Sequence, residues 1–441
     1  MLRLTNLNRS LRWLLQVDQP VLPRSEAEMA AEIADNYRWN FAVNLLDGAS
    51  FWFGLSFISS TTIVPLFISK LTDSTLAIGL VAVIAQGAWF LPQLFTANVV
   101  ERLARKKPVV VNLGFFLERL PMWLIVLAAL MAGRSPMAAL GLFLLGYAWH
   151  GLGAGVIATA WQDLLARCFP VEKRGRFFGT TMFVGAGIGA VAAVFSAWML
   201  RTFPFPTNFV YSFTIAAVFI NLSWVFLALT REPVEPVMTP RQSNRQFWSY
   251  LPQILRRDVN FSRFLAARLL LALSGMGTGF VTVAAVQQWQ VADSTVGVYT
   301  AVYLAGQTVG NLLFGFLADK FGHKLSLEIS GLAAMLAFLL AWLAASPVFY
   351  FAVFALIGVY SGAVIVSGIM VVLEFPAPEK RPTYVGLANT AVGIVSALAP
   401  LAGAGLAAIG YGWLFVVSAV SGLLAFGLMR WWVREPRFAN R

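Results

Sequence analysis

Four charged side chains of this 441-residue chain lie within apolar stretches and not close to the ends of those stretches. They are Asp47, Glu118, Arg119 and Arg268. In the middle of a hydrocarbon layer each charge costs roughly 2.5 kcal/mol or more unless it is paired or hydrated. A carboxylate there can take up and release a proton, and an arginine can bind an anionic group. The four residues therefore indicate substrate binding or proton coupling, with buried ion pairs that lock helices together as the structural alternative.

The positions of these charges predict how they are arranged. Glu118 and Arg119 lie about ten residues into an apolar run, which is roughly 15 Å along a helix and close to the centre of a bilayer. Because neighbouring residues on a helix point about 100° apart, we expect either that these two have different partners or that Arg119 faces the cavity while Glu118 braces it. Asp47 and Arg268 occupy nearly equivalent places in two similar halves of the chain, which makes them candidates for a pair.

Uncharged polar residues form a weaker set of candidates. Hydrogen bonding between helices is their commoner role in a membrane. Those at a suitable depth to contact a solute are Gln86, His150, Gln307 and Asn311. With two histidines far apart in sequence and one cysteine, Cys168, we expect neither a metal site nor an intramolecular disulfide.

The elements that must position these residues are membrane-spanning helices. The chain is 59% hydrophobic and 12% charged, and its mean hydropathy is +0.74. Twelve apolar runs are each at or above the ~20 residues that cross a bilayer. They are 41–69, 74–99, 109–132, 136–165, 177–200, 208–230, 264–290, 294–318, 325–345, 347–374, 384–409 and 412–433. This pattern predicts an all-α integral membrane protein with twelve transmembrane helices.

The distribution of positive charge predicts the orientation. Of the 32 Lys and Arg residues, 27 lie in the terminal segments and the even-numbered connections, so both termini should be cytoplasmic. Only Lys70, Arg134 and Arg201 lie in odd-numbered connections. The net charge of +12 needs no nucleic acid to explain it, because short cytoplasmic loops and anionic lipid headgroups account for it.

The ends of the chain and its centre lie outside the spans. Leu4, Leu7, Leu11 and Leu14 recur at helical spacing among arginines, which is typical of a basic helix on a membrane surface. Ser25 and Glu28 fit a capping box that opens a short second helix leading into the first span. We predict a cytoplasmic N-terminal segment (1–40), a six-helix bundle (41–230), a cytoplasmic linker (231–262), a second six-helix bundle (263–433) and a cytoplasmic tail (434–441).

Three pieces of the first half return in order in the second half. Asp73-Ser74-Thr75 recurs as Asp293-Ser294-Thr295, 220 residues later. Residues 101–106 recur as 319–324, and residues 169–174 recur as 375–381. Two similar halves in a very apolar chain are typical of a secondary transporter whose halves rock around a central site.

Residues 315–324, Gly-Phe-Leu-Ala-Asp-Lys-Phe-Gly-His-Lys, resemble the signature between helices 8 and 9 of the major facilitator superfamily. Residues 97–106 are similar to the copy between helices 2 and 3, although alanines replace both glycines and glutamate replaces aspartate. The resemblance spans residues 40–433 and implies the superfamily's two pseudo-symmetric bundles, which alternate access to a central site. It also implies gate residues in both loops: Glu101, Arg102, Arg105 and Lys106 in the first, and Gly315, Asp319, Lys320, Gly322 and Lys324 in the second. By this resemblance Asp319 meets the start of helix 5 near residues 176–179, and Glu101 meets the start of helix 11 near Tyr384.

Together these observations predict a secondary transporter rather than an enzyme. The chain has no Gly-Lys dipeptide and hence no phosphate-binding loop, which argues against an ATP-driven pump, and we expect no cofactor. We predict proton-coupled export of an amphiphilic or hydrophobic compound. One alternative is proton-linked or facilitated import of an anionic metabolite, and another is a non-transporting scaffold, receptor or lipid scramblase. The expected setting is a monomer in the inner cell membrane, with a small-molecule substrate, lipids and protons as partners and no nucleic acid.

Overall fold

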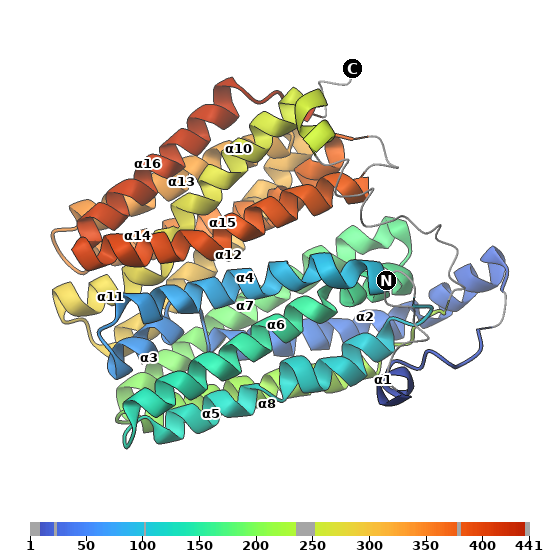
Figure 1. Ribbon diagram of the computed structural model, residues 1–441, viewed down its shortest axis with the longest axis horizontal. Coiled ribbons are helices and arrows are strands. Elements are labelled where there is room, and N and C mark those ends of the chain that lie inside the picture. Colours follow the sequence, from blue (N-terminus) through green and yellow to red (C-terminus); the bar gives the residue numbers. More distant parts are fainter. Residues whose placement is uncertain (1–8, 22–23, 101–102, 235–251, 377–380, 437–441) are drawn as a thin grey trace. The chain divides into compact units, whose positions relative to one another are not determined.

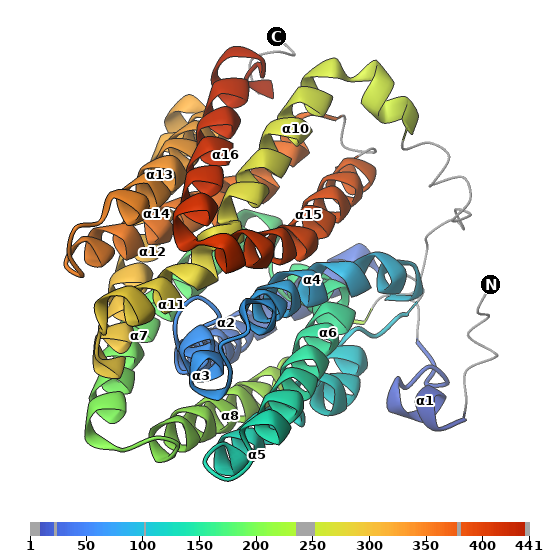
Figure 2. The ribbon, with the colours of Figure 1, turned by 60° about the vertical axis from the view of Figure 1, so that its left-hand side comes forward.

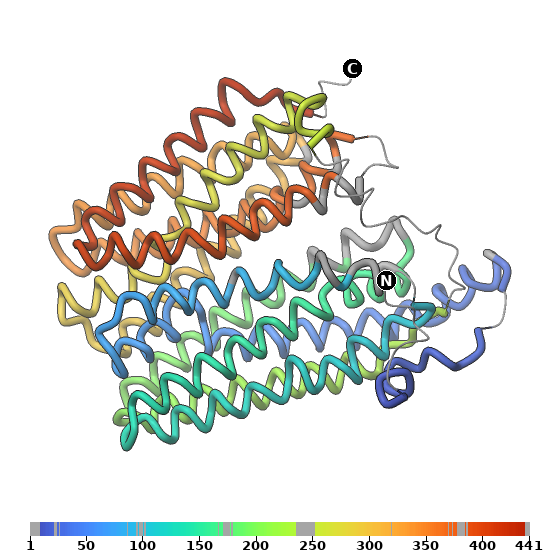
Figure 3. Tube along the Cα trace, in the orientation of Figure 1, coloured from blue at the N-terminus to red at the C-terminus, as the bar shows by residue number. Residues whose placement is uncertain are grey.

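The fold is built almost entirely from long helices. The computed structural model describes residues 9–21, 24–100, 103–234, 252–376 and 381–436, and the remaining segments are the thin grey trace in Figure 1. No β-strand occurs in these described segments. The tube in Figure 3 follows the Cα trace through the same helices.

The helices of the first half begin and end as follows: α1 (Arg9–Leu14), α2 (Glu26–Ser56), α3 (Ile63–Leu71), α4 (Thr75–Val100), the π-helical turns η2 (Val109–Leu113) and η3 (Phe115–Arg119), α5 (Met122–Met131), α6 (Pro136–Cys168), α7 (Val171–Thr202) and α8 (Thr207–Ala228). Those of the second half are α10 (Val259–Ser274), the 3₁₀ turn η4 (Gly275–Gly277), α11 (Thr278–Trp289), α12 (Asp293–Phe321), α13 (His323–Leu343), α14 (Phe349–Met370), the 3₁₀ turn η5 (Val371–Glu374), α15 (Arg381–Ile409) and α16 (Tyr411–Trp431).

Eleven of the twelve predicted spans are helical stretches long and apolar enough to cross a membrane, within the residues that were searched. The first predicted span, 41–69, is divided between α2 and α3. The break falls at a run of Ser and Thr, whose hydroxyls compete for backbone hydrogen bonds. Within this run the Thr62 Oγ1 hydroxyl donates to Ser59 Oγ at 2.8 Å.

The N-terminal capping box is present. The Ser25 backbone N–H donates to Glu28 Oε2 at 2.8 Å, and the Glu28 N–H donates to Ser25 Oγ at 3.3 Å. The helix that it opens is not a short separate one, because α2 continues without a break to Ser56. In α1 the side chain of Leu11 packs against a core that includes Leu15, whereas Trp13 is 79% exposed.

The chain divides into two compact units, and the division passes through helices. Unit 1 comprises Met1–Leu55, Ala88–Ile188 and Val210–Arg241. Unit 2 comprises Ser56–Gly87, Gly189–Phe209 and Gln242–Arg441. The first segment of α4 and the last segment of α7 therefore belong to unit 2, together with all of α3.

Close helix packing within each unit depends on small residues. In unit 2, α12 and α14 lie side by side (Figure 2). A Cβ added at Gly306 or Gly358 would lie only 2.4 or 2.1 Å from a backbone oxygen of the facing helix. Glycines at these positions let the two backbones approach, as small residues do between membrane helices.

Candidate functional site

A cluster of buried ionisable groups lies inside unit 1. Asp47 comes from α2, Glu118 and Arg119 from η3, and His150 from α6, and each side chain is at most 7% exposed. Arg119 forms an ion pair with Glu118, so the two neighbours are partners of each other rather than of separate residues as the helical spacing predicted. The Arg119 Cζ atom also lies 5.4 Å from the centre of the Phe51 ring, a cation–π contact.

The π-helical turn that carries Glu118 and Arg119 has a local cause in the sequence. Pro121 has no backbone N–H to donate to the Leu117 carbonyl four residues earlier, and its ring crowds that carbonyl. The Leu120 N–H instead reaches back five residues to the Phe115 carbonyl at 2.9 Å. Such wide turns are frequent at functional sites.

Helix α6 supports this turn. A Cβ added at Gly153 would lie 1.9 Å from the Leu117 carbonyl oxygen, so only glycine lets α6 approach so closely. Three residues earlier on α6, His150 Nδ1 lies 2.8 Å from the Glu118 carbonyl oxygen. The π-helical turn and α6 therefore hold Glu118 and Arg119 in one place.

Asp47 connects this cluster to a hollow in unit 1. Its carboxylate is within electrostatic range of Arg119 and Glu118 and lies beside Ser223. The hollow is lined by Asn44, Asp47, Gly48, Trp161, Leu165, Phe177, Thr181 and Met182. Among the described residues the buried Thr181 Oγ1 has no hydrogen-bond partner. A protonatable carboxylate and an unpaired hydroxyl thus share the wall of an otherwise mostly apolar hollow.

Arg268 has a different environment inside unit 2. Its guanidinium lies against α14, where a Cβ added at Gly368 would be 2.6 Å from Nη2. The Arg268 charge interacts electrostatically with Tyr360 in the same unit. The Tyr360 hydroxyl donates a hydrogen bond to the Leu271 carbonyl at 3.2 Å. Among the described residues of unit 2, Arg268 has no carboxylate partner, in contrast to Arg119 in unit 1.

The predicted polar residues have varied positions. In unit 2 the Gln307 amide donates to Ser361 Oγ at 3.1 Å, and the Tyr303 hydroxyl lies 3.2 Å from the same oxygen. Asn311 Oδ1 is buried without a hydrogen-bond partner in the described part of the chain. The side chain of Gln86 lies outside the described residues.

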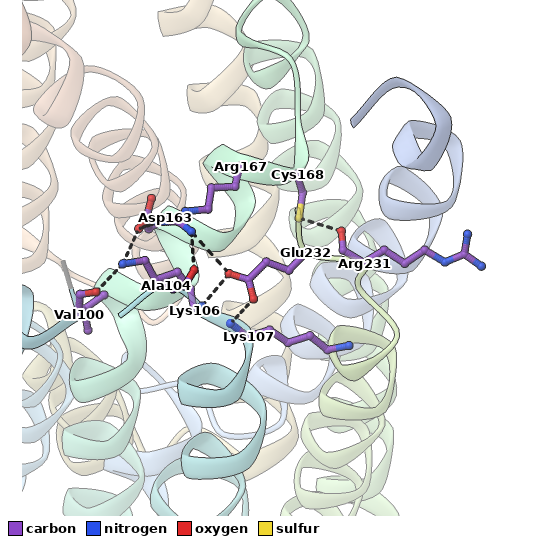
Figure 4. A network of polar contacts seen from close by, with 9 residues as sticks. All are labelled: Val100, Ala104, Lys106, Lys107, Asp163, Arg167, Cys168, Arg231 and Glu232. Atoms are coloured by element: carbon purple, nitrogen blue, oxygen red, sulfur yellow. Dashed lines mark hydrogen bonds and ion pairs between the residues drawn. The ribbon is translucent and has the colours of Figure 1, made fainter. Parts of the chain in front are cut away.

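The first signature loop is held by a polar network in unit 1 (Figure 4). Glu232, which follows α8, accepts the backbone N–H groups of Lys106 at 2.6 Å and Lys107 at 3.0 Å. Lys106 Nζ, on a side chain only 1% exposed, lies 3.1 Å from Asp163 Oδ2. Burial lowers the pKa values of both lysines and raises the pKa of Glu232. Figure 4 shows the Glu232 carboxylate pointing into the network and the Arg231 side chain pointing away from it.

Other residues of the first signature bind locally or are not described. The guanidinium of Arg105 donates to the carbonyls of Gln19 at 3.1 Å and Pro20 at 3.2 Å, which fastens the N-terminal segment to the loop. Glu101 and Arg102 lie outside the described residues.

The second signature loop has a matching arrangement in unit 2. Gly322 has φ +90°, a conformation that favours glycine, and a Cβ there would lie 2.3 Å from a Glu435 carboxylate oxygen. Glu435 accepts the Lys324 N–H at 3.0 Å, and Lys324 Nζ binds Glu328 at 2.9 Å. Lys320 lies over the Phe321 ring, and Gly315 has no neighbour within 4 Å of an added Cβ. The side chain of Asp319 lies outside the described residues.

The sequence reasoning missed the residues that hold these loops. Arg231-Glu232-Pro233 recurs as Arg434-Glu435-Pro436 at the ends of the two halves. Asn40 donates to the Arg231 carbonyl and accepts its N–H, both at 2.9 Å. Asn260 does the same with Arg434 at 3.0 and 2.8 Å. The repeated Arg-Glu-Pro was the available signal.

Part of the sequence and most of the fold resemble known proteins. The sequence profile of the Major Facilitator Superfamily matches residues 265–441, and no curated protein matches the chain in sequence. A mutant of the nucleoside transporter NupG has a similar structure, with a TM-score of 0.66, 15% identity and coverage of 88% of this chain and 98% of that one. The transporter FucP in its outward conformation has a TM-score of 0.59 and 16% identity, with coverage of 88% of this chain and 97% of that one. A POT family transporter in complex with 5-aminolevulinic acid has a TM-score of 0.64 and 11% identity, with coverage of 88% of this chain and 94% of that one. The superfamily's profile therefore matches the second half of this chain, and solved membrane transporters have a similar fold over most of its length.

Proposed function

We propose that the chain is a proton-coupled secondary transporter that exports an amphiphilic or hydrophobic organic compound by alternating access, with Asp47 as the proton-carrying group. The observation that carries this proposal is the cluster of Asp47, Glu118 and Arg119, because it buries two carboxylates with one guanidinium. The small number of buried charges in an otherwise apolar chain supports a solute with apolar surface.

The charge balance of the cluster explains why a proton belongs there. With both carboxylates ionised and the His150 imidazole neutral, the cluster carries one uncompensated negative charge in a membrane interior, which is unfavourable. One proton neutralises it. Glu118 is held by its ion pair with Arg119, whereas Asp47 borders the hollow, so Asp47 is the carboxylate better placed to exchange the proton.

Purified protein in liposomes with an internal pH-sensitive dye tests the proposal. A panel of lipophilic cations, organic anions and neutral amphiphiles is added under an imposed proton gradient. We expect proton flux that depends on one class of solute, and at least a tenfold loss of that flux in Asp47→Asn. Asp18→Asn, which alters an exposed carboxylate outside the spans, is the matched control and should keep the flux.

Two results contradict the proposal. Solute-dependent flux that is unchanged in Asp47→Asn removes Asp47 as the proton carrier. The absence of both proton flux and solute movement across the panel favours the non-transporting scaffold, receptor or scramblase instead.

A second candidate function is import of an anionic metabolite. It is favoured by Arg268, whose guanidinium has no carboxylate partner among the described residues and would be neutralised by an anionic group on the solute. In the same liposomes, uptake of organic anions that is lost in Arg268→Gln and retained in Arg268→Lys supports this candidate. Unchanged uptake in both variants contradicts it.

We further propose a monomer in the inner membrane with both termini in the cytoplasm. The bundles 41–230 and 263–433 would rock about the linker 231–262 during transport. The repeated signature loops, each held by a glutamate that follows the last helix of its half, support this division.

A further inference from the structure

Helix α3 lies at one end of unit 2. At this end, helices from both halves of the sequence contact one another. Helix α3 contacts α11 and α12 there, and its residues from Ile63 to Ile68 are buried. Lys70 Nζ binds Asp293 Oδ1 at 2.9 Å, so the last turn of α3 is fastened to the first residue of α12. We call this region the α3 end.

One face of α12 provides the contacts. Asp293, Gly297 and Thr300 are spaced at i, i+4 and i+7, which places them in one row along the helix. Gly297 packs so closely on α7 that an added Cβ would lie 2.4 Å from Ala197 Cα. Thr300 Oγ1 lies 2.5 Å from Thr62 Oγ1. Along α12, the ion pair of Asp293 is therefore followed by the close backbone approach at Gly297 and then by the buried hydroxyl pair of Thr300.

Two neighbouring contacts complete the closure. The Thr282 hydroxyl of α11 donates to the Thr61 carbonyl at 2.9 Å. Gly79 of α4 approaches α15, where an added Cβ would lie 2.9 Å from the Pro400 carbonyl oxygen. At the α3 end, segments of α4 and α7 from the first half are therefore sealed against helices of the second.

The other copy of the repeat lacks the residues for an equivalent ion pair. Asp293 begins the second copy of the repeated Asp-Ser-Thr, and its counterpart in the first copy is Asp73. The residue equivalent to Lys70 is Gln290, so Asp73 has no corresponding cation, and it is exposed. Lys70 is also one of the few lysines or arginines in the odd-numbered connections, where positive residues are otherwise rare.

We propose that Lys70 and Asp293 form the latch that holds the α3 end shut, and that this ion pair breaks when the end opens during the transport cycle. The two side chains are 34% and 22% exposed. An ion pair in partial contact with water contributes little to stability. It is therefore suited to bias a conformational equilibrium without locking it. The proposal goes beyond the transported solute and the proton site, because it concerns only how one end of the helices closes.

Electron–electron distance measurements test the latch without any transport assay. Spin labels are placed at Leu76→Cys on α4 and Val298→Cys on α12, both exposed, in a Cys168→Ser background. We expect Asp293→Asn and Lys70→Gln each to raise the population with the longer distance roughly two- to fivefold. The charge exchange Lys70→Asp with Asp293→Lys should restore the distribution of the parent.

Asp73→Asn is the matched control, because Asp73 is the repeat equivalent without a lysine partner, and it should leave the distances unchanged. Circular dichroism melting checks that each variant is folded. The proposal is overturned if folded Asp293→Asn and Lys70→Gln keep the parent's distances, or if the charge exchange behaves like the single variants.

Discussion

At the scale of single residues, the environment of each buried charge decides its role. Arg119 is enclosed by Glu118, the Phe51 ring and the field of Asp47, yet its Nε has no acceptor among the described residues. The ion pair therefore leaves hydrogen-bonding capacity unused inside a membrane span. Such an incompletely satisfied pair can rearrange when a neighbouring carboxylate gains or loses a proton, whereas a fully satisfied pair resists change.

Cys168 is a natural reporter at the same scale. Burial raises the pKa of its thiol to about 12, and its Sγ lies 3.5 Å from the Arg231 carbonyl oxygen beside the first signature loop. Thiolate is the reactive form of cysteine. With this pKa, only about one part in ten thousand of Cys168 is thiolate at pH 8. We expect no maleimide labelling of the folded protein at pH 8 and complete labelling in sodium dodecyl sulfate.

An exposed cysteine at Ser10→Cys, in a Cys168→Ser background, is the control and should label within minutes. Because thiolate increases with pH, labelling of Cys168 in folded protein should rise with pH. Labelling of Cys168 at pH 8 as fast as that of Ser10→Cys contradicts the buried position.

At the scale of elements, the π-helical turn is the feature that brings Glu118 and Arg119 together. Pro121 disrupts the regular hydrogen bond, and Gly153 leaves room for the displaced Leu117 carbonyl. The geometry of η3 thus depends on a proline that follows it and on one residue of α6.

Gly153→Ala tests this dependence. The added Cβ would meet the Leu117 carbonyl oxygen at 1.9 Å, so the turn or α6 must shift. We expect a loss of roughly 1–3 kcal/mol in stability, measured as a lower melting temperature in detergent. The matched control is Gly141→Ala on the same helix, where nothing lies within 4 Å of an added Cβ.

The control should be neutral or slightly stabilising, because alanine favours a helix more than glycine does. Equal melting temperatures for Gly153→Ala and Gly141→Ala would show that η3 does not need the close approach.

At the scale of the whole molecule, each half uses the same device to hold its signature loop. In each half, an asparagine of the first long helix hydrogen-bonds the backbone of the arginine that follows the last helix, and the glutamate after that arginine accepts backbone N–H groups of the loop. The loops are thereby tied to the ends of their own halves.

The proposed orientation can be tested with cysteines in cells that carry the Cys168→Ser background. We expect Ser135→Cys and Val348→Cys, both exposed and in odd-numbered connections, to react with a membrane-impermeant maleimide from outside. Ser10→Cys should react only after permeabilisation, because positive residues near the spans keep the N-terminal segment in the cytoplasm. The reverse pattern would invert the orientation.

The amino-acid sequence by itself indicated the membrane class, the approximate limits of eleven of the twelve predicted spans, the capping box at Ser25 and the resemblance to the superfamily. These depend on hydrophobic runs, local hydrogen bonding and short motifs, which are properties of neighbouring residues. It also placed Asp47, Glu118 and Arg119 at depths where charge is costly.

Only the tertiary structure decided which groups meet. Glu118 pairs with its neighbour because a proline-induced π-helical turn replaces the regular helix, and Asp47 joins them because α2 packs beside that turn. The binding of Lys70 to Asp293, and of Glu232 to the first signature loop, joins residues more than a hundred positions apart. Such contacts depend on how helices pack and not on local sequence. The repeated Arg-Glu-Pro could have marked Glu232, but no pattern along the chain indicated that Lys70 binds Asp293.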